Sequence, residues 1–270
     1  MIDYNSRILF FGCGKMGSAI LQNFLDKNID PKNITIIDPL IKNKIININY
    51  FSSIAQASDD HKFDLVIFAF KPQEADKILS QIIKYNIFRQ NTIFVSILAG
   101  IKIEFFANFL GKEAKIIRIM PNLPMAIGEG ISAFVANNHL GADEVKSVMD
   151  FWSKNLTLKS EKEIDLFTAI AGSGPAYLFL FANELIQIAK KSGIEDVDAR
   201  KMVVQMLYGS SKMLLDKKFD IVDLIDSVTS KGGTTEAGLN EFYKGGFKEL
   251  IERVVEAACN KSKELGLSQK

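Results

Sequence analysis

The sequence contains few of the residues that most often perform acid–base and metal chemistry. Its 270 residues include 2 histidines and 2 cysteines. Cys13 and Cys259 are too few for a disulfide framework, and no set of side chains has the spacing of a metal site. We therefore expect a core held together by apolar packing, with no metal ion.

The sequence also lacks an excess of one charge and a long apolar run. Its 33 basic and 32 acidic residues give a formal net charge of +1, which argues against binding to nucleic acid or to an anionic membrane surface. The richest apolar run, Tyr177 to Ala182, is soon followed by Asn183 and Glu184 and falls short of the roughly 20 residues of a membrane span. The first residues show no basic start before an apolar stretch. We expect a soluble cytoplasmic protein.

The first 160 residues alternate short β-rich runs with helical patterns. The predicted strands are apolar almost throughout, which is typical of strands buried on both faces of a mostly parallel sheet. We predict a Rossmann-like, doubly wound α/β domain over residues 1–160. The predicted strands are Arg7 to Phe11, Ile34 to Asp38, Leu65 to Phe70, Thr92 to Ile97, Ile116 to Met120 and Ile131 to Ala136.

The remaining residues, 161–270, have helical periodicity alone and predict an all-α domain. Five consecutive apolar residues from Tyr177 to Phe181 make the first long helix apolar nearly all round. Such a helix must be covered by a large core or by another subunit, so we expect a homodimer at least. The predicted helices are Pro175 to Lys191, Val197 to Leu215, Thr235 to Tyr243 and Phe247 to Leu265.

A glycine-bearing loop follows the first strand and opens a helix. Gly12 permits the sharp turn, Gly14 lets backbone N–H groups approach a pyrophosphate, and Gly17 lets the helix pack on the strand. The helix N-terminus adds partial positive charge for the phosphates. We predict a dinucleotide site that uses the whole loop: Gly12, Cys13, Gly14, Lys15, Met16 and Gly17.

Asp38 ends the second strand about 20 residues after Gly17, which is the place of a ribose-binding acid. Its carboxylate would accept hydrogen bonds from the ribose hydroxyls of NADH and repel the 2′-phosphate of NADPH. The sequence thus favours NADH. The counter-argument is that a nearby lysine could pair with the phosphate, the candidates being Lys15, Lys42 and Lys44.

Three further loops follow predicted strands where a nicotinamide would lie. They contain Ala69-Phe70-Lys71-Pro72, Ala99-Gly100 and Asn122, the last between two prolines. Taken alone, each loop is better explained as an ordinary connection between a strand and a helix.

A second glycine loop, Ser230 to Thr235, opens a helix near the end of the chain. Its free N–H groups and hydroxyls could hold a carboxylate without a buried cation. The alternative is an ordinary helix cap made by Thr234 or Thr235.

No residue in these motifs is an obvious general base. His61 and His139 lie in polar segments typical of surface loops. Oxidation of an alcohol needs a base for the hydroxyl proton, whereas a protonated cyclic imine accepts hydride directly and chiefly needs positioning. The sequence therefore favours reduction of an imine.

Taken together, the motifs resemble those of Δ1-pyrroline-5-carboxylate reductase along nearly the whole chain. Among the motifs named next, the last two are specific to this family, whereas the first is shared with many dehydrogenases. The motifs are Gly12 to Gly17, Phe70-Lys71-Pro72-Gln73, Arg118 to Asn122, Ala171-Gly172-Ser173-Gly174-Pro175-Ala176-Tyr177 and Val228 to Thr235.

The resemblance implies reduction of pyrroline-5-carboxylate to proline with NADH or NADPH, in a dimer or an assembly of dimers. It places the second glycine loop on the substrate carboxylate and gives Thr235 a hydrogen bond to the ring nitrogen. Two departures are Lys231, where relatives commonly carry proline, and Asp38-Pro39, where many carry a basic or small polar pair. The implied substrate-binding residues are Glu161, Ser173, Ser230, Gly232, Gly233, Thr234 and Thr235.

Two other interpretations remain open. A β-hydroxyacid dehydrogenase has the same two-domain plan, but that family uses a lysine on the first long helix of the second domain. Here Pro175 to Ala189 contains none, and Lys190 comes at the helix end. A non-catalytic dinucleotide sensor would keep the first glycine loop and have no reason to keep the second.

Overall fold

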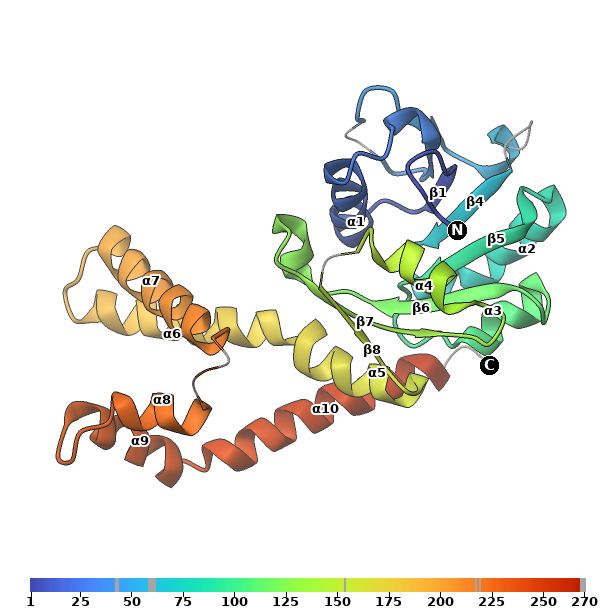
Figure 1. Cartoon of the computed structure of the whole chain (residues 1–270). Helices are drawn as coiled ribbons and strands as arrows, with labels where there is room; N and C mark the ends of the chain where they lie inside the picture. The colour runs from blue at the N-terminus through green and yellow to red at the C-terminus, as the bar shows by residue number, and fades with distance from the viewer. Residues whose placement is uncertain (42–43, 58–61, 153, 217, 219, 268–270) are drawn as a thin grey trace. The chain divides into compact units, whose positions relative to one another are not determined.

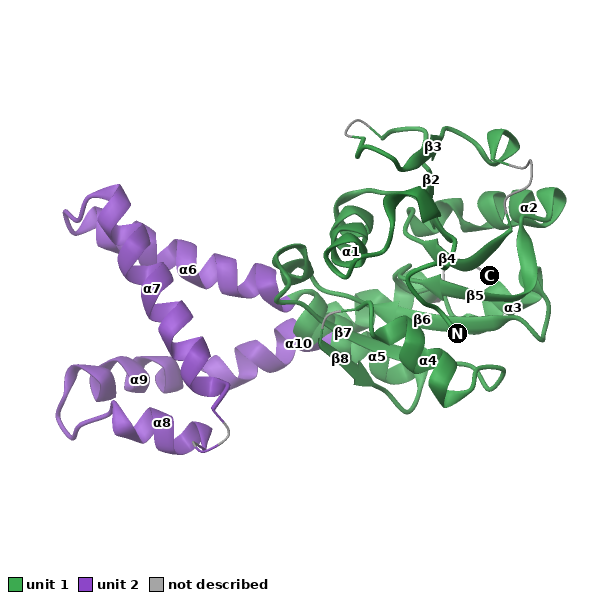
Figure 2. Ribbon diagram, turned by 45° about the horizontal axis from the view of Figure 1, so that its top comes forward, with its two compact units in different colours: residues 1–173, 258–270 green, residues 174–257 purple. Residues whose placement is uncertain are grey.

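The computed structural model describes residues 1–41, 44–57, 62–152, 154–216, 218 and 220–267 (Figure 1). The chain divides into two compact units (Figure 2). Unit 1 contains residues 1–173 and 258–270, and unit 2 contains residues 174–257. This division differs from the predicted boundary at residue 160, because residues 161–167 pack on the sheet and the end of the chain contacts Asp165 and the loop at Gly100.

Unit 1 is built on one eight-stranded sheet in the order β3-β2-β1-β4-β5-β6-β7-β8. All neighbouring strands are parallel except β6 and β7, which are antiparallel, so the predicted mostly parallel doubly wound sheet is confirmed. The strands are β1 (Ile8–Phe11), β2 (Ile34–Ile37), β3 (Asn49–Phe51), β4 (Phe63–Phe68), β5 (Phe88–Ser96), β6 (Lys115–Met120), β7 (Ile131–Ala136) and β8 (Lys154–Thr157).

The six predicted strands are confirmed, and the two edge strands β3 and β8 were missed. The three residues of β3 are all partly exposed, and every residue of β8 is exposed. Edge strands that face water need no continuous apolar run, and that run was the signal that revealed the six central strands.

Helices cover both faces of the sheet because alternate side chains of each strand point to opposite faces. On one face Phe10 packs with Phe24 of α1 and Met149 of α4. On the other face Phe68 packs with Leu79 of α2 and Phe106 of α3. The helices of unit 1 are α1 (Lys15–Asp26), α2 (Ala75–Tyr85), α3 (Ile103–Leu110), α4 (Ala142–Met149) and α5 (Glu161–Phe167).

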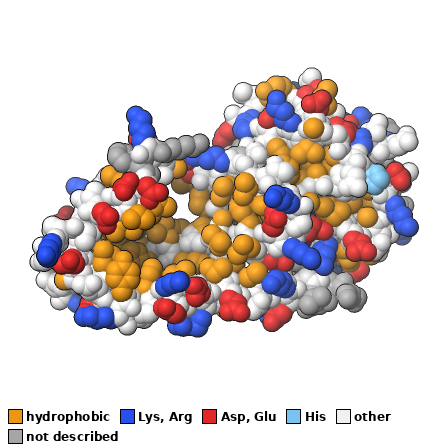
Figure 3. Space-filling model, turned by 60° about the horizontal axis from the view of Figure 1, so that its bottom comes forward, with side chains coloured by type: hydrophobic (Ala, Val, Ile, Leu, Met, Phe, Trp, Pro, Cys, Tyr) orange, Lys and Arg blue, Asp and Glu red, His pale blue; other side chains and the backbone are white. Residues whose placement is uncertain are grey.

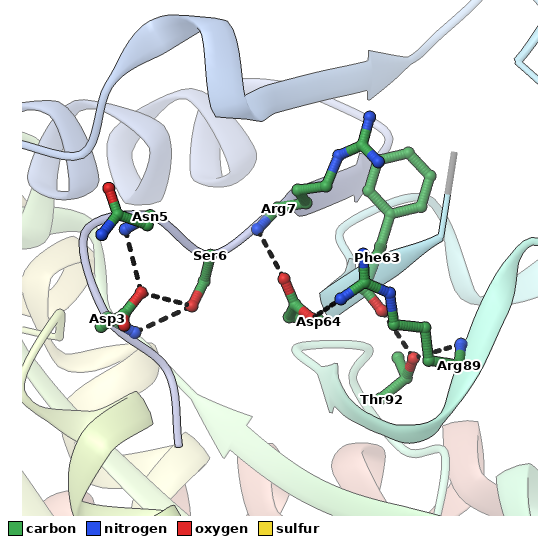
Figure 4. A network of polar contacts seen from close by, with 8 residues as sticks. All are labelled: Asp3, Asn5, Ser6, Arg7, Phe63, Asp64, Arg89 and Thr92. Carbon is green, nitrogen blue, oxygen red and sulfur yellow. Dashed lines mark hydrogen bonds and ion pairs between the residues drawn. The ribbon is translucent and has the colours of Figure 1, made fainter. Parts of the chain in front are cut away.

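A polar network joins the amino ends of β1, β4 and β5 (Figure 4). Asp64 accepts a hydrogen bond from the Arg7 N–H at 2.9 Å and forms an ion pair with Arg89 at 2.9 Å. The Thr92 hydroxyl donates to the Phe63 carbonyl at 2.6 Å. These bonds fix the amino-terminal ends of the strands, opposite to the strand ends that carry the glycine loop. A structural role accounts for them.

The helices of unit 2 follow one another without a strand in the described residues. All four predicted helices are confirmed, and α8 was missed because its seven residues are too few to show a periodic pattern. α10 starts in unit 2 and ends in unit 1. The bounds are α6 (Gly174–Lys191), α7 (Asp196–Leu214), α8 (Ile221–Ser227), α9 (Thr234–Lys244) and α10 (Phe247–Leu267).

The helical unit exposes a large amount of apolar surface (Figure 3). Phe179 is 56% exposed and Leu180 is 63% exposed, and Ala189 is the one buried residue of α6. By length and composition alone, one helical stretch in the described part of the chain, Glu161–Lys191, could cross a membrane, and only 17% of its most apolar window is buried. The side chains of α6 are therefore largely exposed in the single chain, as expected for a helix that is apolar nearly all round.

Candidate active site

The first glycine loop joins β1 to α1 through two glycines that no other residue could replace without strain. Gly12 has φ +81°, and a β-carbon there would lie 2.7 Å from the Ala69 carbonyl oxygen. A β-carbon on Gly17 would lie 3.0 Å from the Gly12 carbonyl oxygen. These are the turn and the close packing that the sequence predicted for the two glycines.

Gly14 differs from both, because nothing lies within 4 Å of the place where its β-carbon would be. It is the residue before α1, and no side chain caps the helix there. The backbone N–H groups in the first turn of a helix have no intrahelical acceptor, and they carry the positive end of the helix dipole. An open helix N-terminus beside a turn fits a pyrophosphate.

Asp38 directly follows β2 and is bound to the glycine loop. Its carboxylate accepts a hydrogen bond from the Cys13 N–H at 2.8 Å and another from the Leu40 N–H at 2.8 Å. Each oxygen keeps a second lone pair, so the carboxylate can still accept a bond from a ribose hydroxyl. The sequence did not predict the bond to Cys13, which holds the loop against the end of β2.

A small pocket opens beside Asp38. The Lys44 ammonium lies 5.5 Å from the centre of the Tyr50 ring in this pocket, so one carboxylate and one cation line the same space. Of the other two lysines suggested for this region, Lys42 lies outside the described residues and Lys15 is the first residue of α1. The pocket is lined by Asp38, Pro39, Ile41, Lys44, Tyr50, Phe51 and Ser52.

The Cys13 thiol is a poor nucleophile in this setting. Burial raises its pKa, the hydrogen bond with the Ser18 hydroxyl acts in the opposite direction, and the Asp38 carboxylate raises the pKa further. A thiol reacts as its thiolate, so a raised pKa disfavours a nucleophilic role for Cys13.

The loops after β4 and β5 lie at the same edge of the sheet as the glycine loop. β4 pairs with β1 and β5 pairs with β4 in parallel register. The Ala69 N–H donates to the Phe11 carbonyl at 2.8 Å, next to Gly12. Ala69 and Phe70 are half-buried, and Lys71 is exposed at the start of the short helical turn Pro72–Glu74. The structure thus brings together the predicted cofactor residues of these two strands.

Gly100 is closed off on one side by the end of the chain. It has φ +79°, and a β-carbon there would lie 2.6 Å from the Gly266 backbone nitrogen. Ala99, its neighbour in the same loop, is half-buried. The need for glycine at position 100 therefore comes from a protein contact as well as from backbone conformation.

Asn122, predicted to bind cofactor, is buried and bridges two protein segments. Its side-chain oxygen accepts from the Ile131 N–H at 2.9 Å, and its nitrogen donates to the Ala171 carbonyl at 3.2 Å. Its amide thus fixes the loop after β6. A direct contact with cofactor stays a prediction.

Glu161, predicted to bind substrate, is the first residue of α5. Its Oε1 accepts from Arg118 Nη1 at 2.9 Å and from the Ile103 N–H at 3.0 Å. This oxygen is thus committed to β6 and α3. A contact between Glu161 and substrate stays a prediction.

The sequence predicted no role for Arg118, although Arg118 lies in one of the motifs of the resemblance. The guanidinium is 3% exposed, and its Nε and Nη2 have no hydrogen-bond partner among the described residues. A single charged residue inside the apolar run Ile116 to Met120 was the available signal, because a buried charge requires a partner.

Ser173 is the last residue of the first segment of unit 1. Its N–H donates to the Thr168 carbonyl at 2.8 Å, which closes a π-helical turn over Thr168–Gly172. Such turns are frequent at functional sites. The side chain is half-buried.

The second glycine loop belongs to unit 2 and leads into α9. Gly232 has φ +74°, and the Gly233 N–H donates to the Ser230 carbonyl at 2.9 Å. A β-carbon on Gly233 would overlap the Ser230 hydroxyl. Thr234 and Thr235 form the start of α9, where backbone N–H groups lack an intrahelical acceptor. The loop is therefore an open helix N-terminus, as predicted.

Glu236 adds a feature that the sequence did not reveal. Its carboxylate accepts a hydrogen bond from the Gly232 N–H at 2.7 Å. One N–H group of the loop is thus satisfied within the chain, which leaves those of the first helical turn for an anion.

The structure describes one of the two histidines. His139 lies 3.4 Å from the carboxylate of Glu113, which is 92% exposed, and His61 lies outside the described residues. No group of three or more metal-ligating side chains occurs in the part of the chain that the structure describes.

Two family models match the chain. A model described as pyrroline-5-carboxylate reductase dimerisation matches residues 161–265. A model described as NADP oxidoreductase, coenzyme F420-dependent, matches residues 7–100. The first explains why α6 is apolar and uncovered, since a partner subunit covers such a surface in a dimer.

Named relatives match along nearly the whole chain. Pyrroline-5-carboxylate reductase 2 of Bacillus subtilis is 30% identical over 96% of this chain and 95% of its own. Pyrroline-5-carboxylate reductase of Aquifex aeolicus is 33% identical over 96% of this chain and 97% of its own.

A solved structure agrees. The crystal structure of Plasmodium falciparum pyrroline carboxylate reductase with NADP bound is 32% identical, has a TM-score of 0.87, and covers 97% of this chain and 99% of its own. The sequence, the fold and both glycine loops lead to one assignment: this chain belongs to the pyrroline-5-carboxylate reductase family.

Proposed function

We propose that this protein reduces Δ1-pyrroline-5-carboxylate to L-proline with a reduced nicotinamide dinucleotide. The observation that carries the proposal is the match over 96% of the chain to reductases of this name. Two open helix N-termini, one before α1 and one before α9, supply sites for a pyrophosphate and a carboxylate. The test is whether reduced nicotinamide is consumed only when the cyclic imine is present.

The residues of unit 1 fit a dinucleotide. Nothing lies near the place of a Gly14 β-carbon, so that side of the glycine loop is open. Gly12 brings the loop against the backbone of Ala69, just after β4. The first turn of α1 would hold the pyrophosphate, and the loops at Ala69 and Ala99 would border the nicotinamide. When bound, the nicotinamide supplies a hydride to the carbon of the protonated C=N bond, whose π electrons pass to the nitrogen.

The role of unit 2 in this proposal is to hold and orient the imine. The N–H groups of Thr234 and Thr235 would bind the substrate carboxylate, together with the loop residues Ser230, Gly232 and Gly233. The Thr235 hydroxyl would accept a hydrogen bond from the protonated ring nitrogen. No side chain needs to remove a proton in the hydride step, which agrees with the chemistry of an already electrophilic iminium carbon.

We propose NADH as the preferred cofactor because of Asp38. Two backbone N–H groups fix its carboxylate, so it cannot easily rotate away from a 2′-phosphate. Like charges about 4 Å apart cost on the order of 4 kcal/mol at an effective dielectric near 20, before screening. Lys44 lines the same pocket, and the Plasmodium relative holds NADP; these are the arguments for NADPH.

We propose a homodimer, or an assembly of dimers, in the cytoplasm, with neither nucleic acid nor membrane as a partner. Leu178, Phe179 and Leu180 are each exposed by 46% or more in the single chain, and a partner subunit would cover them. Sedimentation at micromolar protein concentration tests this, since a monomer under those conditions would contradict it.

A further inference from the structure

Gly100 and Gly266 are far apart in the sequence, and their backbones are in contact within unit 1. A β-carbon on Gly100 would lie 2.6 Å from the Gly266 nitrogen, and one on Gly266 would lie 2.5 Å from the Gly100 carbonyl oxygen. Real β-carbons do not approach other atoms so closely. The last turn of α10 therefore lies against the backbone of the loop after β5, and neither position has room for a side chain.

A second contact fixes the same end of α10. The Ser262 hydroxyl donates to Asp165 Oδ1 of α5 at 2.7 Å, and Ser262 is 4% exposed. Ser262 and Gly266 are four residues apart and so lie on one face of the helix. This face contacts α5 through Ser262 and the Gly100 loop through Gly266.

Gly266 is not explained by the helix itself. Its φ is not positive, so it does not form the left-handed cap that commonly ends a helix. Gly266 is the next-to-last residue of α10, and helices favour alanine over glycine, by up to about 1 kcal/mol in their interior. The close approach to Gly100 is therefore the reason for glycine at this position.

The Gly100 loop lies where the nicotinamide is expected. Leu98 and Ile101 are each 2% exposed and anchor the loop in the core on both sides of Ala99 and Gly100. β5 pairs with β4, and β4 pairs with β1, so the loop shares one edge of the sheet with Gly12. A shift of the last turn of α10 would move Ala99 and Gly100 relative to that edge.

We propose that the last turn of α10 positions the loop at Ala99 and Gly100 for dinucleotide binding, with Gly266 as the positioning residue. This inference rests on the proposed function, because that function places Ala99 and Gly100 beside the cofactor. It adds a role for the end of the chain in cofactor binding. Ser262 supports the role by fixing the helix to α5.

The test compares Gly266→Ala with Lys263→Ala, an exposed residue one turn earlier in α10. For Gly266→Ala we expect the KM for NADH to rise about tenfold while the KM for the imine changes less than about twofold. Calorimetric binding of NADH without imine should weaken by a similar factor. Lys263→Ala should match the wild type in all three measurements.

Ser262→Ala removes the bond to Asp165 without adding bulk, so it tests the inference even where Gly266→Ala fails to fold. Ser262→Ala should weaken NADH binding in the same direction by about two- to threefold. The inference is overturned if Gly266→Ala raises the melting temperature and leaves NADH binding unchanged, as helix propensity alone predicts. It is also overturned if stability falls while the KM for NADH and the KM for the imine move together. A wild type that binds NADH but does not reduce the imine would instead overturn the proposed function.

Discussion

Arg118 and Glu161 form an ion pair of 2.9 Å between Nη1 and Oε1, and the arginine side chain is 3% exposed. The pair joins β6, an inner strand of the sheet, to the first residue of α5. The same oxygen accepts the Ile103 N–H, so three elements meet at one carboxylate. Glu161 therefore stabilises the start of α5, whatever it contributes to substrate binding.

Glu161→Gln should reduce the free energy of unfolding by about 3 kcal/mol, because it leaves a buried guanidinium without a counter-charge. The control is Glu163→Gln in the same turn of α5, where the half-buried Glu163 carboxylate accepts the Lys159 N–H at 3.0 Å and a glutamine oxygen can still accept that bond. Urea denaturation measures both. Equal stability of Glu161→Gln and the wild type, with a raised KM for the imine, would show that Glu161 acts on substrate instead.

Thr235→Ala should lower kcat/KM by about 10- to 1000-fold, because it removes the hydroxyl proposed to bind the ring nitrogen in the transition state. Thr235→Ser keeps the hydroxyl and should restore most of the loss. Steady-state kinetics with varied imine at saturating NADH measure the effect. Wild-type kinetics in the alanine variant would remove Thr235 from the site.

Asp38→Asn should narrow the difference in KM between NADH and NADPH, because it removes the charge that repels the 2′-phosphate. It should also weaken NADH binding somewhat, since the amide nitrogen cannot accept the N–H bond that the second carboxylate oxygen accepts. Lys44→Ala should act in the opposite direction and raise the KM for NADPH alone. A wild type that clearly prefers NADPH would show that the lysine dominates.

Glu144 should make stability depend on pH. Its hydrogen bonds from the Lys115 ammonium and from the Gly141 N–H hold its pKa below the ordinary value of 4.5. A lowered pKa in the folded state means that the stabilisation is complete above pH 4.5 and is lost as the pH falls through the folded-state pKa. Glu144→Gln should be less stable than the wild type by about 1 kcal/mol at pH 7, with the difference closing in acid.

Denaturation at a series of pH values follows this difference. Glu129→Gln is the control, since Glu129 is 71% exposed and its nearest cation, Lys154, is 3.6 Å away and 67% exposed. A gap between Glu144→Gln and the wild type that stays constant down to pH 3 would contradict the assignment.

Local patterns in the sequence predicted the elements that carry most of the fold. Buried apolar runs such as Ile8–Phe11 revealed the central strands, and the periodicity of residues such as Phe247–Leu267 revealed the long helices. Both glycine loops were placed correctly at helix starts. These features depend on residues near one another in the chain.

The contacts that the sequence could not reveal join distant residues. Asp38 to the Cys13 N–H, Glu161 to Arg118, and Gly100 to Gly266 each depend on the packed sheet and helices. Nothing in the local pattern pairs these residues. The sequence therefore predicted where the backbone loops of the site lie, and it did not predict which side chains contact one another.

A product assay shows whether the chain forms proline from the cyclic imine. Purified protein is incubated with NADH and Δ1-pyrroline-5-carboxylate, and L-proline formed is measured against NADH consumed. We expect L-proline in equal molar amount to the NADH oxidised, with no oxidation when the imine is left out. Absence of proline, or equal turnover of a 3-hydroxy acid with NAD⁺, would contradict it.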